Sequence, residues 1–247
     1  TKQALGTRVL NLVVSRLEKG IEKALAVPRV RVDGALKHAG TLIVASEKGV
    51  QLTATEREGV SELNPRELGV TQPGALAFQL LRPEWRVQLK AEVMAPLIRS
   101  EVLQRVDLSE ELLRCTAYVR YWIERAGCKT FRLQAPAPGV PLIVGGRNVA
   151  RVSEIDASNG IWQVELHNKQ EDEYGLTVQY QIARGTVVKP LKTLEVESQK
   201  GFVVVMAGGR AQVSIVGEPP GLKPEDSRSI PANFGAGDLA DAIYCFR

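Results

Sequence analysis

Apolar and polar residues alternate along two stretches near the middle of the chain. In residues 85–93, apolar side chains take every second position, with charged or amide side chains between them, and residues 112–123 begin and end in the same alternation. Because successive side chains of a β-strand point to opposite faces of the sheet, a period of two predicts a strand with one buried face. The predicted buried residues are Trp85, Val87, Leu89, Ala91 and Val93 in the first stretch, and Leu113, Cys115, Ala117, Val119, Tyr121 and Ile123 in the second.

Further short strands are predicted beyond residues 124–127, which are expected to turn the chain. Gly, Pro, Asn and Asp separate them, and these residues favour turns. The predicted strands cover 130–134, 142–144, 150–155, 161–166 and 176–183. Short strands and turns at this spacing are typical of an antiparallel β-sandwich of the immunoglobulin or fibronectin kind.

Helical periodicity is weak in this sequence. It is limited to Leu17, Ile21 and Leu25 and to one-turn candidates at 65–68 and 109–112. A parallel α/β sheet needs a long helix between successive strands. The sequence therefore predicts a mostly β fold, with a central antiparallel β-sandwich and minor short helices.

The sequence also contains an internal repeat with a period of about 160 residues. Each copy has, in the same order, a proline, a glycine with an apolar strand, a tight turn, a second short strand, a Leu-x-Pro motif and a closing apolar run. The first copy places these features at Pro28, 40–46, Lys48-Gly49, 50–52, Leu63-Asn64-Pro65 and 75–81, and the second at Pro190, 201–207, Gly208-Gly209, 211–213, Leu222-Lys223-Pro224 and 242–246. The repeat predicts a β unit over 1–83, the sandwich over 84–186 and a related β unit over 187–247. The alternative is a chance similarity between two β-rich segments.

The two copies continue differently. After the first copy the chain runs through Arg82-Pro83 into the next predicted strand, whereas after the second it stops at Arg247. The chain also begins at Thr1, without a methionine or an apolar leader. We therefore expect a fragment of a longer repetitive protein, whose neighbouring domains are its partners, since a period of this length suits an array of domains.

Composition and charge narrow the classes of partner. Hydrophobic residues make up 44% of the chain and charged residues 24%, which excludes a disordered polymer. Because no apolar run approaches the roughly 18 residues that cross a bilayer, no membrane insertion is expected. The basic excess lies in residues 1–50, which contain no aromatic residue. Since binders of single-stranded nucleic acid combine basic groups with stacking aromatics, no nucleic-acid partner is expected.

Metal and thiol chemistry are also not expected. His38 and His167 are far apart and have no partner at the spacing of metal ligands, so we predict no metal site. No cofactor motif occurs, and no cofactor is expected. Three cysteines is an odd number, and the spacing of Cys115 and Cys128 does not suit a disulfide. All three cysteines, Cys245 included, are predicted to be free thiols that fill the core.

Two motifs suggest catalysis, but their contexts do not support it. Gly235-Ala236-Gly237-Asp238 resembles the anion hole and catalytic base of ribokinase-like sugar kinases, in which the glycine amides open a helix. That family needs a parallel α/β sheet upstream, so a loop or helix start is preferred. Glu171-Asp172-Glu173 supplies carboxylates at a predicted hairpin tip, where two carboxyls have no fixed separation. Calcium binding there is an alternative. We predict that the chain is not an enzyme.

The best candidate for a binding surface is the second face of the 112–123 strand. Arg114, Tyr118, Arg120 and Trp122 alternate with its apolar residues and so share one face. Aromatic planes beside guanidinium groups suit a sugar, an anionic polymer or a partner protein. The alternative is that the aromatic residues pack under a neighbouring module while the arginines pair with Glu124 or other acids.

Several segments carry a resemblance to a class of known proteins. They are 121–127 (Tyr-Trp-Ile-Glu-Arg-Ala-Gly), 131–133 (Phe-Arg-Leu), 160–162 (Gly-Ile-Trp) and 176–180 (Leu-Thr-Val-Gln-Tyr). Over residues 30–247 the strand pattern resembles segments of large, functionally uncharacterised bacterial proteins built from many β domains. The resemblance implies an envelope or surface-associated location and no activity.

Composition, repeat and resemblance together predict a non-enzymatic structural or protein-interaction module. One alternative is a carbohydrate-binding or adhesive module that uses the Arg114–Trp122 face. The other is an accessory domain of a larger hydrolase.

Overall fold

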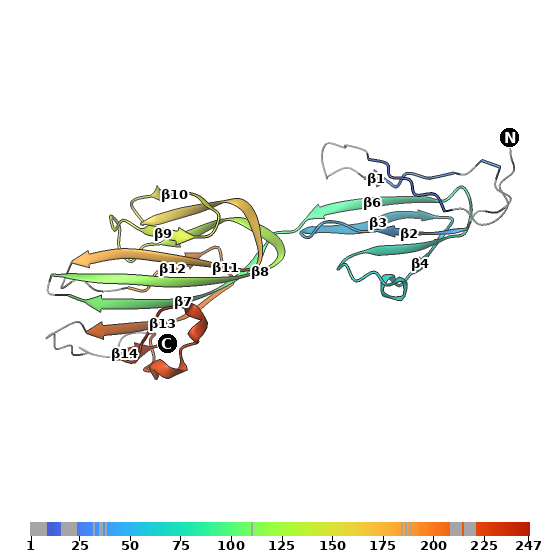
Figure 1. The fold of residues 1–247 in the computed structure, drawn as a ribbon. Coiled ribbons are helices and arrows are strands. Elements are labelled where there is room, and N and C mark those ends of the chain that lie inside the picture. Colours follow the sequence, from blue (N-terminus) through green and yellow to red (C-terminus); the bar gives the residue numbers. More distant parts are fainter. Residues whose placement is uncertain are drawn as a thin grey trace. The chain divides into compact units, whose positions relative to one another are not determined.

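The computed structural model divides the chain into two compact units. The first comprises Thr1–Ser46 and Val50–Val93, and the second Glu47–Gly49 and Met94–Arg247. The residues described are 9–15, 24–31, 33–34, 37, 39–109, 111–183, 185, 187, 189–207, 214 and 221–247. Within them the fold is mostly β, as predicted, and the helices are short 3₁₀ turns (Figure 1).

The first unit contains two antiparallel sheets of three strands each. One has the order β1-β6-β3 and the other β2-β5-β4. The strands are β1 (Leu25–Ala26), β2 (Gly40–Val44), β3 (Val50–Glu58), β4 (Val60–Leu63), β5 (Leu76–Leu80) and β6 (Arg86–Val93). The 3₁₀ helix η1 (Pro65–Leu68) links β4 to β5, where the sequence predicts a one-turn helix.

The two sheets share one hydrophobic cluster. Phe78 of β5 lies in it with Trp85, Val87 and Leu89, and all four side chains are buried. The alternation predicted for this strand is therefore confirmed over 85–91. It is wrong for Val93, which is 69% exposed where the strand ends.

The second unit is built on one eight-stranded mixed sheet. Its order is β10-β11-β8-β7-β13-β14, with β9 beside β11 and β12 beside β8. The strands are β7 (Leu97–Leu108), β8 (Leu112–Gln134), β9 (Ile143–Gly146), β10 (Val149–Asp156), β11 (Ile161–Ala183), β12 (Lys192–Leu194), β13 (Ser198–Ala207) and β14 (Ala242–Phe246). Two 3₁₀ turns, η2 (Ser227–Ser229) and η3 (Ala232–Phe234), precede β14.

Strand β8 bends back on itself. The rings of Tyr121 and Phe131 stack with centroids 4.4 Å apart, although ten residues separate them. In a straight strand that distance would be about 33 Å. The bend lies near Arg125, whose φ is 67°, and β11 bends beside it at Asp172, whose φ is 66°.

The main core lies inside this double bend. It joins residues of the first half of β8, such as Val119, to residues of the second half, such as Leu133. Residues 124–127 therefore turn the chain as predicted, but within one strand. The two halves of β8 face each other through side chains, and each half hydrogen-bonds to β11 and to a different outer strand.

The observed strand pairing and strand directions differ from the sequence-based prediction at four places. The sheet is not purely antiparallel, because β13 runs parallel to β7. The strand that follows Trp85 pairs with β1 and β3 of the first unit, and β13 and β14 belong to the same sheet as the central strands. Glu171–Glu173 does not form a hairpin tip but lies inside β11 at its bend.

The predicted helices have different outcomes. In the candidate at 109–112, Glu110 lies outside the described residues, and the Ser109 side chain accepts a hydrogen bond from the Leu112 amide at 3.2 Å. Leu25 lies in β1, whereas Leu17 and Ile21 are outside the described residues. Within the described part of the chain, no helix is long and apolar enough to span a membrane.

Candidate functional site

The four predicted binding residues lie on one face of β8. Arg114 is exposed, and Tyr118, Arg120 and Trp122 are half-buried. The residues between them belong to the core on the opposite face, as the alternation predicts. The structure therefore brings the four residues together as a row, but their surroundings differ along it.

Arg120 is held on three sides. Its Nε donates to Oε1 of Glu173 on β11 at 3.0 Å. Its Cζ lies 5.0 Å from the ring centroid of Trp122 and 5.8 Å from that of Phe234. The side chain is only 15% exposed. Because a cation over an aromatic face is attracted by the ring quadrupole, Arg120 interacts favourably with both rings as well as with the Glu173 carboxylate.

Tyr118 packs beside a second hydrophobic cluster, on the face of the sheet opposite the main core. This cluster joins Leu103 of β7, Phe202 of β13 and residues of the segment before β14. Within it, Ile230 and Phe234 are buried. The segment over residues 226–240 thus packs against the part of the face where Tyr118 lies. A hollow of about 450 Å³ remains beside it, lined by Tyr118, Arg120 and Phe234 among others.

The segment is anchored to the sheet by Arg105. Its guanidinium donates to the Ala236 carbonyl at 3.3 Å and to both carboxylate oxygens of Asp107 at 3.0 and 3.1 Å. Gly235 follows η3 with a φ of 68°, a left-handed conformation that glycine adopts without strain. Neither Arg105 nor Phe234 could be identified from the sequence as a neighbour of the row, because each comes from a distant strand or loop.

Trp122 borders the uncovered part of the face. A hollow of about 350 Å³ lies beside it, lined by Arg99 and Glu101 of β7 and by Ser198 and Lys200 of β13. Arg99 is paired with Glu124. An aromatic ring beside hydroxyl, ammonium and carboxylate groups can stack on and hydrogen-bond to a small polar ligand.

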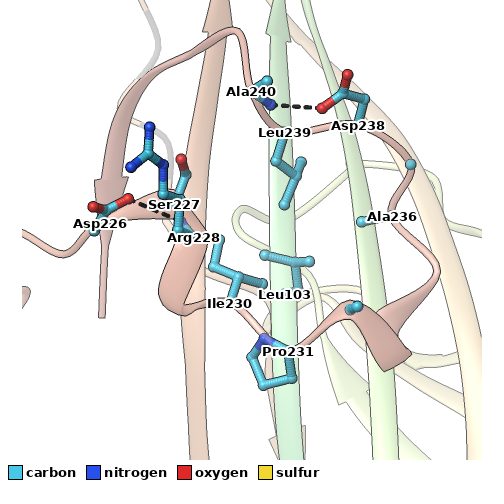
Figure 2. A pocket seen from close by; sticks show the side chains of 12 residues that line it. Leu103, Asp226, Ser227, Arg228, Ile230, Pro231, Ala236, Asp238, Leu239 and Ala240 are labelled. Atoms are coloured by element: carbon cyan, nitrogen blue, oxygen red, sulfur yellow. Dashed lines mark hydrogen bonds between the residues drawn. The ribbon is translucent and has the colours of Figure 1, made fainter.

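The sequence motif Gly235–Asp238 lies in the loop between η3 and β14. It borders a hollow of about 580 Å³ (Figure 2). The two carboxylates that line this hollow accept hydrogen bonds from backbone amides (Figure 2). Asp238 accepts from the Ala240 amide at 2.8 Å, and Asp226 accepts from the Arg228 amide at 2.9 Å. The Asp238 side chain caps a turn instead of facing a substrate from a helix start.

The cysteines are free and buried, as predicted. Burial raises the pKa of the Cys115 thiol to about 11 and also raises the pKa values of Cys128 and Cys245. Since the thiolate is the reactive form, these side chains act as core residues. Among the described residues, no three His, Cys, Asp or Glu side chains are grouped so that they could hold a metal ion.

No protein-family model matches the chain, and no curated protein matches it.

Proposed function

We propose that this chain is a non-enzymatic structural or protein-interaction module of a larger repetitive bacterial protein. The observation that supports the proposal is a three-strand arrangement that occurs in both copies of the internal repeat. In the first copy the closing strand β5 lies between β2 and β4.

In the second copy the closing strand β14 has the same two neighbours. It pairs antiparallel with β13 on one side. On the other side it pairs with the chain at the Leu-x-Pro motif: Lys223 and Arg247 exchange backbone hydrogen bonds of 2.9 and 2.8 Å, and Glu225 donates to Cys245 at 3.0 Å.

A capped 3₁₀ turn lies close to the motif in both copies, but not at the same position. Asn64, inside the first motif, caps η1 with its side chain, whereas Asp226, two residues after the second motif, caps η2. The closing strand thus has similar neighbours in two stretches far apart in the sequence. The turn Gly208-Gly209 and the strand 211–213, predicted for the second copy, lie outside the described residues. Repeated β units of this kind are typical of proteins that act as arrays of domains.

The finer class of the fold is part of the proposal. We infer that the bend of β8 and β11 makes the central part of the second unit a two-layered β-sandwich, with the stacked Tyr121 and Phe131 between the layers. The parallel pair of β7 and β13 adds to the antiparallel strands of such a domain.

The test is the reading frame of the parent gene on both sides of this segment. We expect further copies of the Gly-strand, turn and Leu-x-Pro pattern. A reading frame with no further copy would contradict the array. A frame with a hydrolase catalytic domain and no further copy would favour an accessory domain instead.

A second candidate function is glycan binding at the hollow beside Trp122, because its ring lies next to Lys200, Ser198 and Glu101. A glycan array with the purified chain tests it. Trp122→Ala should reduce binding at least about tenfold, as expected for loss of a stacked ring, and Arg151→Ala, at an exposed position on β10, should not. Wild-type binding at background level removes this candidate.

A further inference from the structure

In the first copy of the repeat, strand β6 covers the inner face of β2 and β5. Leu42 of β2 and Phe78 of β5 are paired on this face, and they belong to one cluster with Trp85, Val87 and Leu89 of the segment that forms β6. Phe78 is fully buried there. An extended segment with apolar residues at every second position thus completes the core of the first copy.

The equivalent face of the second copy can be identified from the strand pairing. Val203 and Val205 of β13 pair with Phe246 and Tyr244 of β14. In the aligned repeat, Gly201 corresponds to Gly40, so that Val203 and Val205 correspond to Leu42 and Val44. The opposite face, formed by Phe202, Val204 and Met206, is already buried in the second cluster.

Among the described residues, a groove of about 600 Å³ runs along this equivalent face. Its apolar surface comes from Val102, Pro190, Gly201, Val203, Gly221 and Leu222, and in part from Phe202, whose side chain is otherwise buried in the second cluster. Its rim carries polar and basic groups, contributed by Gln104, Lys192, Thr193, Gln199, Lys200 and Arg247. Val203 itself is only partly buried, and its covered side packs against the main core.

A second position, Val187, is also uncovered in the second copy. In the first copy Leu25, three residues before Pro28, pairs with Leu89 of β6. The counterpart in the second copy is Val187, three residues before Pro190, and it is 76% exposed. Val203, at the position of Leu42, and Val187, at the position of Leu25, therefore keep exposed surface where β6 contacts their counterparts in the first copy.

We propose that the groove is the docking site of an extended strand of the β6 type, with apolar residues at every second position, supplied by a neighbouring β module. The strand lies across Val203 and Leu222 and pairs with the chain at Val187. This inference rests on the proposed function, because it takes from it the equivalence of the two copies.

The experiment places such a strand beside the groove. A second copy of the sequence 81–93 is joined after Arg247, and Val187→Cys is introduced as a reporter, since the native cysteines are buried. The control carries the same extension with three of its alternating apolar positions, those of Trp85, Val87 and Leu89, changed to serine.

We expect the alternating extension to slow thiol labelling at position 187 at least about tenfold relative to the serine control, because pairing removes the side chain from water. Leu222→Glu in the groove should abolish that protection. Equal labelling with both extensions overturns the docking site while leaving the array intact.

Hydrogen exchange distinguishes a wrong docking site from a wrong equivalence of the two copies. If the backbone amide of Arg247 exchanges freely in the chain without an extension, β14 lacks its second neighbour. The equivalence of the copies is then wrong, and with it both the proposed function and this inference.

Discussion

Tyr121 and Tyr174 both stack on Phe131, yet replacing each with phenylalanine is expected to change stability in opposite directions. Tyr121 Oη is buried without a hydrogen-bond partner among the described residues, whereas Tyr174 Oη donates to the Arg147 carbonyl at 2.6 Å. A buried, unpaired hydroxyl costs about 1–3 kcal/mol. Tyr121→Phe should therefore raise the free energy of unfolding by about 1 kcal/mol and Tyr174→Phe should lower it by about 1 kcal/mol.

Urea denaturation followed by circular dichroism measures both changes. Each variant keeps its ring in the stack with Phe131, so the comparison isolates the hydroxyl group. If Tyr121→Phe is destabilised as much as Tyr174→Phe, the Tyr121 hydroxyl is bonded in solution and the premise is wrong.

Because the Cys115 thiol is buried, we expect the folded state to lose stability at alkaline pH. Burial raises its pKa from an ordinary value of 9.0 to about 11. Below pH 9 the thiol is neutral in both states. Between pH 9 and pH 11 the unfolded chain releases the proton and the folded chain keeps it, so rising pH favours unfolding.

Melting temperatures at pH 8, 9 and 10 test this effect. The wild type should lose stability over this range. Cys115→Ala should lose less, because this thiol no longer contributes, but it should still lose some, because other buried thiols and tyrosines remain. An unchanged slope in Cys115→Ala would show that this thiol is not the source.

At the scale of elements, Gly201 permits the close parallel pairing of β13 with β7. A Cβ atom at this position would lie 2.0 Å from the Val102 carbonyl oxygen. Gly201→Ala should therefore destabilise the second unit by about 3 kcal/mol, at the upper end of the cost of overpacking. Gly175→Ala on β11, where the nearest atom would be 3.8 Å away, is the matched control and should change stability by less than about 0.5 kcal/mol.

Chemical denaturation of the two glycine variants compares them directly. A Gly201→Ala protein as stable as the control would mean that β13 and β7 are farther apart than described.

The sequence predicts strands well and their partners poorly. Alternation identifies the buried side of β8 residue by residue, from Leu113 to Ile123, because a period of two follows from strand geometry alone. The same pattern carries no information about which strand lies alongside or in which direction. The parallel pairing of β13 with β7 and the grouping of β6 with β1 therefore could not be predicted.

The sequence predicts the turn at residues 124–127 but not that it lies within one continuous strand, for a related reason. The bend places the left-handed φ on Arg125, a residue type that gives no signal for this conformation. The candidate site was predictable to the same extent: alternation places Arg120 and Trp122 on one face. It does not reveal that Glu173 and Phe234 hold Arg120, since these contacts depend on how distant segments fold.

At the scale of the whole molecule, the division into two units predicts two separate unfolding events. Each unit has its own buried cluster, represented by Val87 in the first and Val119 in the second, and both side chains are 1% exposed. An aspartate at either position would be a buried, unpaired charge, which a folded core of this kind does not tolerate.

Differential scanning calorimetry of the wild type should therefore resolve two transitions. Val87→Asp should remove one and leave the other at its original temperature, and Val119→Asp should do the reverse. Because a cooperative transition is the property of a single core, loss of both transitions in either variant would mean that the chain folds as one unit. Independent unfolding instead supports a chain of separable β modules, in which each core is completed by its own strands and by those that its neighbours supply.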